Sequence, residues 1–229
     1  VISHEVGHAL GLPHNMKASS AYAVDSLRSG DFTQKYGIAT TIMDYARYNY
    51  IAQPGDENIR FVRQLGPYDD YAIEWGYRYY GLSPKVEQSQ LKAMVDAKSL
   101  DPMYMFGGRG NDPNSQTENI GDDPIKASTY GLNNLKIVAK NLMDWTLSPN
   151  DTYDDLEELY GEMVGVYRRY IYHVHSMIGG VYQTKHNTNQ TNTVTYQNVE
   201  RAKQLAALDF LKSNLWQTQN WLMDNRIIS

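Results

Sequence analysis

The sequence predicts a mainly α-helical fold in which a metal-binding helix leads into a helical bundle, with at most a small β-hairpin. Three histidines near the start of the chain have the spacing of a metal site built on a helix and the turn after it. Further along, apolar residues recur at intervals of three and four, which is the period of a helix with one buried face. Two of these later segments begin with a capping residue followed directly by proline, which indicates a helix start.

The length and charge of the chain limit what it can be. Its 229 residues suffice for one large domain or two small ones. Its net charge of −5, without any basic run, argues against a nucleic-acid partner. No apolar stretch approaches the roughly 18 residues of a transmembrane segment. The absence of cysteine excludes a disulfide framework and leaves the redox compartment open.

The first two histidines lie on a predicted helix. His4 and His8 are four residues apart, so both imidazoles project from one face and can reach one ion at about 2.0–2.1 Å, the length of a Zn–N bond. Glu5 lies about 100° further round the helix, which places its carboxylate beside the metal rather than on it. There it can hold the water that attacks a substrate.

The third histidine requires the helix to stop. On a continuing helix His14 would lie about 15 Å along the axis from His4, out of reach of the same ion. Gly11 is where a left-handed residue would end the helix, and Pro13 keeps Leu12 out of the helical conformation. The chain can then fold back and supply His14 as a ligand. Three histidines with one open position form a zinc site of the catalytic kind.

These residues match the pattern H-E-x-x-H-x-x-G-x-x-H, and the chain resembles the metzincin zinc proteases that carry it. Metzincins also have a tight turn with a methionine beneath the metal, and residues 41–45 (Thr-Ile-Met-Asp-Tyr) look like that Met-turn. The resemblance implies a packing role for Met43. In the astacin and serralysin branches, a tyrosine two residues later can ligate zinc and support the oxyanion of the reaction. Tyr45 occupies that position, so the resemblance implies a catalytic role for it.

A wider resemblance joins the chain to large, exported bacterial metzincin-like proteases. It rests on five segments: 14–15, 42–45, 66–77, 122–128 and 179–182. It implies a zinc-dependent endopeptidase that acts on peptide or protein substrates, with Glu5 as general base, and an extracytoplasmic location. Because the sequence opens inside the zinc helix, we also expect an upstream N-terminal domain of the same protein. That domain would supply the sheet that metzincins place before this helix.

A second hypothesis comes from another class of protein. The helical C-terminal part could be a non-catalytic binding or docking module, with a structural zinc site kept for stability. The presence of Glu5 argues against this reading, because a structural zinc site usually closes its fourth position with a protein ligand.

Between the zinc motif and residue 80, short elements are expected. Helical turns are expected at 23–28 and 32–36, the second capped by Asp31 and ended by Gly37. A longer helix is expected over 67–80. In metzincins the segment after the Met-turn lines the pocket for the residue that follows the cut bond. The candidates for that pocket here are Tyr48, Tyr50 and Ile51.

Beyond residue 80 the sequence predicts helices and one β-hairpin. Ser83 and Asp123 each precede a proline and predict helix starts. The expected helices cover 84–98, 124 to beyond Leu142, 154–178 and 199–215. The inward face of the last helix is expected to carry Ala202, Leu205, Leu208 and Leu211. Short β-prone runs at 181–185 and 193–196 predict the hairpin.

Two further expectations concern metals and domains. The loop 107–122 is rich in Gly, Asn and Asp, and oxygen-rich loops can hold calcium, although solvated turns have the same composition. His173 and His175 are two residues apart on a predicted helix, so they should face different directions. We expect a metzincin C-terminal subdomain over 1–80 and a helical region packed on it over 81–229.

Overall fold

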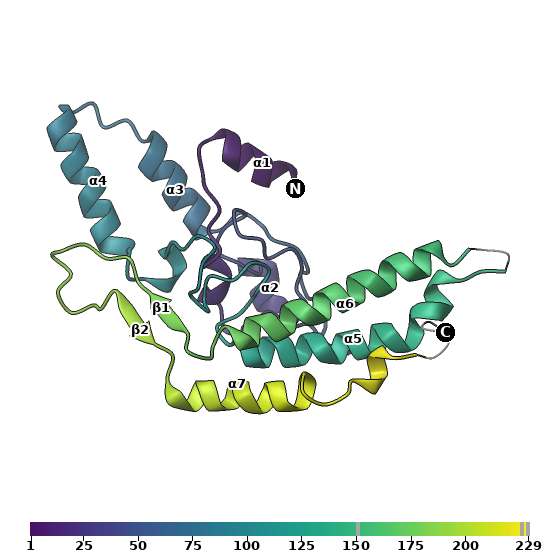
Figure 1. The fold of residues 1–229 in the computed structure, drawn as a ribbon. Helices are drawn as coiled ribbons and strands as arrows, with labels where there is room; N and C mark the ends of the chain where they lie inside the picture. The colour runs from purple at the N-terminus through teal and green to yellow at the C-terminus, as the bar shows by residue number, and fades with distance from the viewer. Residues whose placement is uncertain (150–151, 225–226, 228–229) are drawn as a thin grey trace.

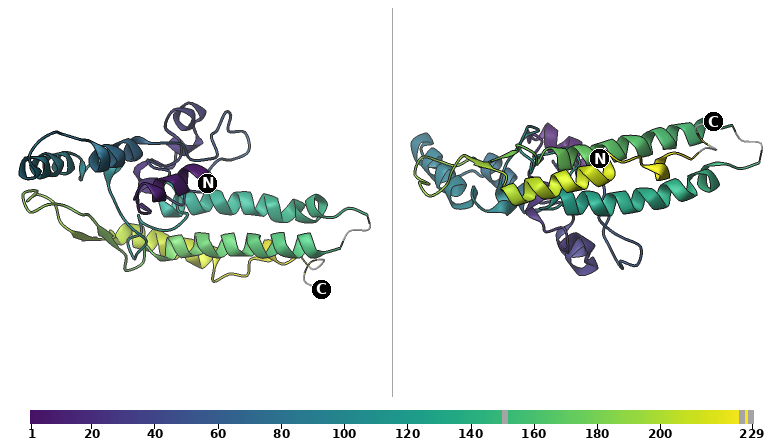
Figure 2. Two further views of the ribbon diagram at one scale, coloured as in Figure 1. Left: turned by 90° about the horizontal axis from the view of Figure 1, so that it is seen from above. Right: turned by 60° about the horizontal axis from the view of Figure 1, so that its bottom comes forward.

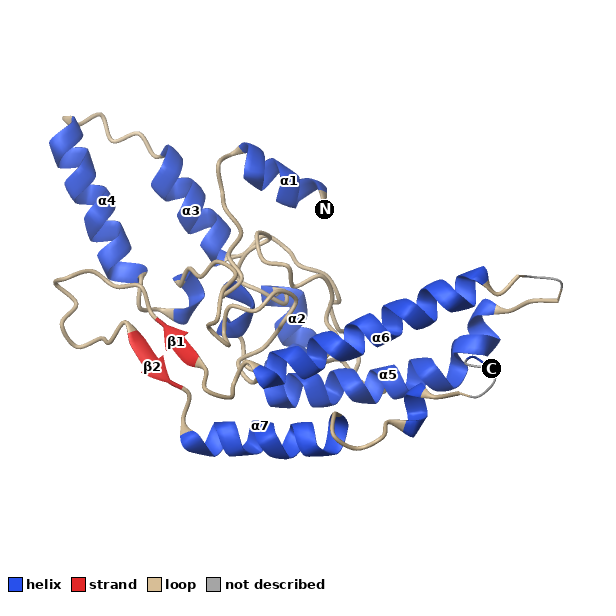
Figure 3. Ribbon diagram, viewed as in Figure 1, coloured by secondary structure: helices blue, strands red, loops and turns tan. Residues whose placement is uncertain are grey.

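The structure, a computed structural model, describes residues 1–149, 152–224 and 227. This part of the chain is mainly α-helical with a small antiparallel hairpin, as predicted (Figure 1, Figure 3). Within it, no helix combines the length and the apolar character needed to cross a membrane. The helices and strands are α1 (Ile2–Ala9), α2 (Gly30–Tyr36), α3 (Pro67–Tyr77), α4 (Pro84–Lys98), α5 (Pro124–Thr146), α6 (Asp154–His175), β1 (Val181–Gln183), β2 (Tyr196–Asn198) and α7 (Arg201–Asn214).

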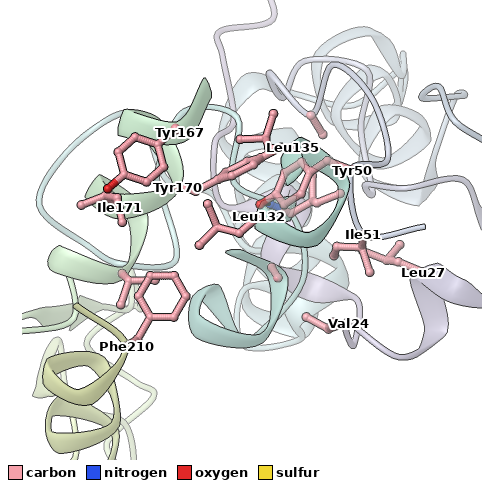
Figure 4. Packing of buried hydrophobic residues seen from close by; sticks show 14 of the residues in the cluster. Val24, Leu27, Tyr50, Ile51, Leu132, Leu135, Tyr167, Tyr170, Ile171 and Phe210 are labelled. Carbon is pink, nitrogen blue, oxygen red and sulfur yellow. The ribbon is translucent and has the colours of Figure 1, made fainter. Parts of the chain in front are cut away.

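The long helices α5 and α6 lie antiparallel and side by side, and α7 packs along them (Figure 1, Figure 2). Their apolar faces meet in a buried cluster that includes Leu132 and Leu135 of α5 and Ile171 of α6 (Figure 4). The two helices approach closely at Gly131, where a Cβ atom would lie only 2.5 Å from the ring of Tyr170. Gly131 therefore sets the separation of α5 and α6, because any side chain there would collide with that ring.

The same buried cluster includes residues from the irregular segment between α1 and α3. Val24, Leu27 and Ile51 belong to it, and the ring of Tyr50 lies 4.7 Å from that of Tyr170 between centroids. The bundle thus supports the segment that carries the candidate site. Since the cluster draws on both sides of residue 80, the division of the chain at that point stays a prediction.

The helix starts mostly follow the capping signals. Helices α3, α4 and α5 each have proline in the first turn, and α4 spans the predicted residues. Asp123 caps α5, because its carboxylate accepts hydrogen bonds from the amides of Ile125 (2.9 Å) and Lys126 (3.1 Å). Helix α2 differs from the prediction. It begins two residues earlier, so Ser29 caps it and Asp31 lies inside its first turn.

Other boundaries and one helix face also differ from the sequence prediction. Helix α3 ends at Tyr77 and α6 at His175, rather than at 80 and 178, and β2 begins at Tyr196 rather than 193. In α7 the buried residues are Ala207, Phe210 and Leu211, whereas Ala202 and Leu205 are exposed. The predicted inward face was therefore wrong for Ala202 and Leu205 and right for Leu211, because apolar residues occur on two faces of α7 and only packing against α6 selects one.

His173 is buried in the core, whereas His175 is exposed, so the two rings do face different surroundings. Nε2 of His173 lies 2.9 Å from the carbonyl oxygen of Thr117. Since a carbonyl only accepts, this nitrogen carries the proton of the neutral ring. Nδ1 is buried without a hydrogen-bond partner in the described part of the chain. Burial lowers the pKa of His173 to about 4.

This pKa shift predicts a pH dependence of stability. The folded state resists protonation of His173 down to about pH 4, while the ring in the unfolded chain titrates near 6.5. The contribution of His173 to the free energy of unfolding is therefore fully present above the unfolded pKa. It is lost as the pH drops toward 4, by at most about 3 kcal/mol. His173→Gln should weaken this fall, measured as the urea unfolding free energy between about pH 7 and 4.

The matched control is His175→Gln, which changes an exposed ring. Burial raises the pKa of Asp44 to about 7, so this carboxyl group changes the unfolding free energy with pH in the opposite direction to His173. Because Asp44 is present in both variants, the pH slope of His173→Gln is compared with that of His175→Gln. Identical pH slopes for His173→Gln and His175→Gln would contradict the prediction.

Candidate metal centre

Helix α1 ends in the left-handed turn that the sequence predicts. Gly11 has a φ of 84°, and its amide donates to the carbonyl of His8 at 2.9 Å. The amide of Leu12 donates to the carbonyl of Gly7 at 3.0 Å. These two bonds form a Schellman motif, in which a residue without a Cβ reverses the chain at the helix end. The reversal returns His14 to the helix.

The three histidines meet through their Nε2 atoms. Nε2 of His14 lies 3.2 Å from that of His4 and 3.0 Å from that of His8. In two of the rings the other nitrogen has a carbonyl partner: His4 Nδ1 lies 2.7 Å from the oxygen of Ile42, and His8 Nδ1 lies 2.8 Å from that of Leu12. A carbonyl accepts only, so these rings carry their protons on Nδ1 and present Nε2 lone pairs to the centre.

This arrangement fits a zinc ion. Nitrogens bound to one tetrahedral zinc at about 2.0–2.1 Å lie about 3.3–3.4 Å apart, close to the two separations that His14 Nε2 makes with His4 and His8. Carbonyl partners on the distal nitrogens are the usual way in which metal-binding histidines are oriented. Within the described residues, no other group of three or more His, Cys, Asp or Glu side chains brings its ligand atoms together.

Met43 lies directly beneath α1. It is fully buried, and a Cβ atom on Gly7 would come within 2.3 Å of its Sδ atom. The carbonyl of Met43 also accepts a hydrogen bond from the amide of Asn15 at 3.1 Å. The turn around Met43 therefore contacts both the helix that carries two histidines and the segment that follows the third.

Asp69 holds the Met-turn against the start of α3. Its buried carboxylate accepts hydrogen bonds from the hydroxyl of Thr41 and from the amides of Ile42 (3.1 Å) and Gly66 (2.9 Å). Burial raises the pKa of Asp69, and these hydrogen bonds oppose the rise. Sequence reasoning gave Asp69 no role at the site. Its only signal was its place in the Gly-Pro-Tyr-Asp segment of the family resemblance.

Arg63 makes a second connection to the Met-turn. Its Nη1 atom donates to the carbonyl of Ile42 at 2.8 Å and to that of Asp44. The Ile42 carbonyl is also the partner of His4 Nδ1, so Arg63 and the first histidine share one acceptor. No sequence pattern indicated this role, because a single arginine in an irregular segment has no periodicity or motif.

Tyr45 and Glu5 flank the triad. The ring of Tyr45 lies 4.5 Å from that of His14 and 5.5 Å from that of His4, between centroids. Glu5 is exposed on α1. Burial and the neighbouring His8 and His4 lower the pKa of His14, and the carboxylate of Glu5 opposes them. The net lowering favours the neutral ring, which is the form that binds a metal.

The loop 107–122 gives no support to a calcium site. The carboxylate of Asp112 pairs with Lys17 Nζ at 2.7 Å and accepts from the amides of Gln183 (3.0 Å) and Asn114 (2.9 Å). Both members of this ion pair are buried. The acidic side chain at the centre of the loop thus connects the segment after His14 to β1. It is not free to bind a cation.

The predicted pocket residues lie elsewhere. Ile51 is fully buried in the core, and Tyr48 and Tyr50 line a separate cavity of about 470 Å³ against α5. The cavity that includes His4 has a volume of about 460 Å³ and is lined by Arg47 and Arg63 instead. The prediction was wrong for Tyr50 and Ile51, because the chain turns inward after Arg47 and packs both into the helical bundle, whereas for the exposed Tyr48 it stays a prediction.

Comparison with known families agrees with this geometry. A family model described as Met-zincin matches residues 1–229. The chain belongs to the Met-zincin family. No curated protein and no solved structure gives a match. Membership makes this a metalloprotease-type domain and points to zinc as the metal for the histidine triad.

This Met-zincin chain should bind one zinc ion through His4, His8 and His14. Elemental analysis after adding zinc at about pH 7.5 and removing the excess should find one equivalent, with occupancy falling below about pH 6 as the imidazoles protonate. His14→Ala should lose most of the bound zinc, while the exposed His175→Ala control should keep it. Less than about a tenth of an equivalent in the unaltered chain would contradict the metal assignment.

The contact between Gly7 and Met43 predicts a sign reversal in stability. In a helix, Gly→Ala normally stabilises by about 1 kcal/mol. In this Met-zincin, Gly7→Ala should instead lower the melting temperature, because its Cβ would meet Met43 Sδ. Met43→Ala alone should destabilise by about 2–5 kcal/mol. Gly7→Ala made in the Met43→Ala background should then stabilise. The exposed Met223→Ala is the control, and a stabilising Gly7→Ala in the unaltered chain would contradict the contact.

Proposed function

We propose that this Met-zincin is a zinc-dependent endopeptidase. The observation that carries the proposal is the convergence of three histidine Nε2 atoms beside an exposed glutamate. His4, His8 and His14 supply three ligands, and three ligands leave a fourth position for water or substrate. Glu5 follows the first of these histidines on α1, and its carboxylate raises the pKa of His14 against the lowering caused by burial, so it lies close enough to interact electrostatically with the triad.

The chain's own residues account for the proton transfers. When bound, zinc supplies Lewis acidity that makes water a nucleophile near neutral pH and polarises the scissile carbonyl. Glu5 accepts the proton of the attacking water at its carboxylate and passes it to the leaving amine. The hydroxyl of Tyr45 would donate a hydrogen bond to the oxyanion of the substrate. The contact of its ring with that of His14, 4.5 Å between centroids, supports this role.

The alternative function is a docking module with a structural zinc site. Such a site normally has four protein ligands. The triad has three histidines, and no described Cys, Asp or Glu joins them in the group of convergent ligand atoms. This difference favours the catalytic reading.

Helix α1 also supports an interaction with a further part of the protein. Ile2, Val6 and Leu10 lie at helical spacing and are exposed. We propose that an upstream domain covers this apolar face, completes the substrate cleft and shares an extracytoplasmic location with this chain.

A chain extended upstream should cleave casein at least about a hundredfold faster, because positioning of substrate can supply several kcal/mol of rate acceleration. Equal rates would contradict this proposal.

Substitution of Glu5 tests the catalytic proposal. Glu5→Gln should keep one equivalent of zinc and lose casein hydrolysis by about 10²–10⁴-fold, as expected for a lost general base. Tyr45→Phe should leave the melting temperature unchanged and lower kcat by up to about 10²–10³-fold, as expected for a lost oxyanion donor. The controls are Glu87→Gln on α4 and Tyr48→Phe outside the triad. Activity of Glu5→Gln within about threefold of the unaltered chain would rule out Glu5 as the base.

A further inference from the structure

The cavity beside the first metal ligand has a distinct chemistry. Its volume is about 460 Å³, and it is bounded by His4 on one side and by the segment after the Met-turn on another. Its lining includes the apolar side chains of Ile42, Val62 and Leu65 together with two guanidinium groups, Arg47 and Arg63. No aspartate or glutamate lines it. The cavity is therefore cationic, with apolar walls.

The two arginines are held in different ways. Arg63 is half-buried and fixed to the Met-turn through Nη1, which donates to the carbonyls of Ile42 and Asp44. A guanidinium has five N–H donors, so the group keeps donors for a ligand while it is anchored. No carboxylate side chain forms an ion pair with Arg63 within the described residues. The hydrogen-bond partners of its Nη1 atom are backbone carbonyls.

Arg47 also lines this cavity. It is 63% exposed, and its Nε atom lies 3.2 Å from Glu118. Glu118 is buried and is shared with Arg169, so one carboxylate serves two guanidinium groups. The guanidinium of Arg47 also lies 5.9 Å from the centroid of the Tyr45 ring, which packs against His14. Arg47 thus has a positive charge that its ion pair only partly offsets, close to the site of bond cleavage.

We propose that this cavity is a specificity pocket for an acidic side chain of the substrate, at a residue next to the cut bond, and that Arg47 determines the preference. The inference rests on the endopeptidase function proposed above. An aspartate or glutamate side chain would place its carboxylate between Arg47 and Arg63, where guanidinium donors match a carboxylate in geometry and charge.

The test uses zinc-loaded Glu5→Gln protein, so that binding is measured without turnover, alongside cleavage by the unaltered chain. The probes are peptides blocked at both ends that differ at one residue: Asp, Asn, Leu or Lys. The Asp peptide should bind at least about tenfold more tightly than the Asn peptide, the gain expected for a hydrogen-bonded charge pair. Cleavage products identified by mass spectrometry should place the Asp beside the cut bond.

Variants at Arg47 give the decisive comparison. Arg47→Gln should remove most of the preference for Asp, and Arg47→Glu should shift it toward Lys. The matched control is Arg168→Gln, which makes the same charge change on an exposed residue of α6 that does not line the cavity. Arg63→Gln is avoided, because it would also release the Met-turn. Melting temperatures should show that the Arg47 variants fold, since this side chain is mostly exposed.

The possible results distinguish failure of the proposed specificity pocket from failure of the proposed endopeptidase function. Equal binding of the Asp and Asn peptides, or no measurable binding of either, overturns the proposal. So does a preference that Arg47→Gln leaves intact. A peptide with a free C-terminal carboxylate provides another arm. If only that peptide binds more tightly, the pocket binds the C-terminal carboxylate of a peptide rather than an acidic side chain, and the proposal is wrong. A preference for Asp without hydrolysis by either the unaltered chain or the chain extended upstream supports the pocket and contradicts the endopeptidase function.

Discussion

The three imidazoles can meet at one point only if the chain reverses immediately after the second of them. The left-handed conformation of Gly11 makes that reversal, and the two Schellman hydrogen bonds fix it. The carbonyl of Leu12, which lies within the reversed segment, accepts from Nδ1 of His8. The turn therefore both delivers His14 and orients the ring of the ligand before it.

The Met-turn supports this arrangement from below. Met43 fills the space beneath Gly7, and its carbonyl binds the amide of Asn15. The turn is itself held by the guanidinium of Arg63, from the segment before α3, and by the carboxylate of Asp69, from the first turn of α3. A metal centre with only three protein ligands depends on such outer contacts, because the ligands must keep their positions when the fourth position exchanges water and substrate.

The helical bundle acts as the scaffold of this site. The buried ion pair of Lys17 and Asp112 connects the segment after His14 to the loop before α5, and Gln183 of β1 hydrogen-bonds to both side chains. The irregular segment around Tyr50 is packed into the cluster between α5 and α6. That inward turn after Arg47 also explains why a charged residue, rather than the aromatic residues that follow it, reaches the cavity beside His4.

The sequence by itself determined the convergence of His4, His8 and His14, the helix that carries the first two and the turn that ends it. These features depend on spacing along one helix and on the φ angle that Gly11 permits. It also determined most helix starts, since a cap followed by proline acts locally. It did not identify Asp69 or Arg63, whose roles arise from contacts between segments some 20 to 28 residues apart. The inward face of α7 and the lining of the cavity at His4 were likewise decided only by tertiary packing. Where apolar or aromatic residues occur on more than one face, the partner surface chooses which of them is buried.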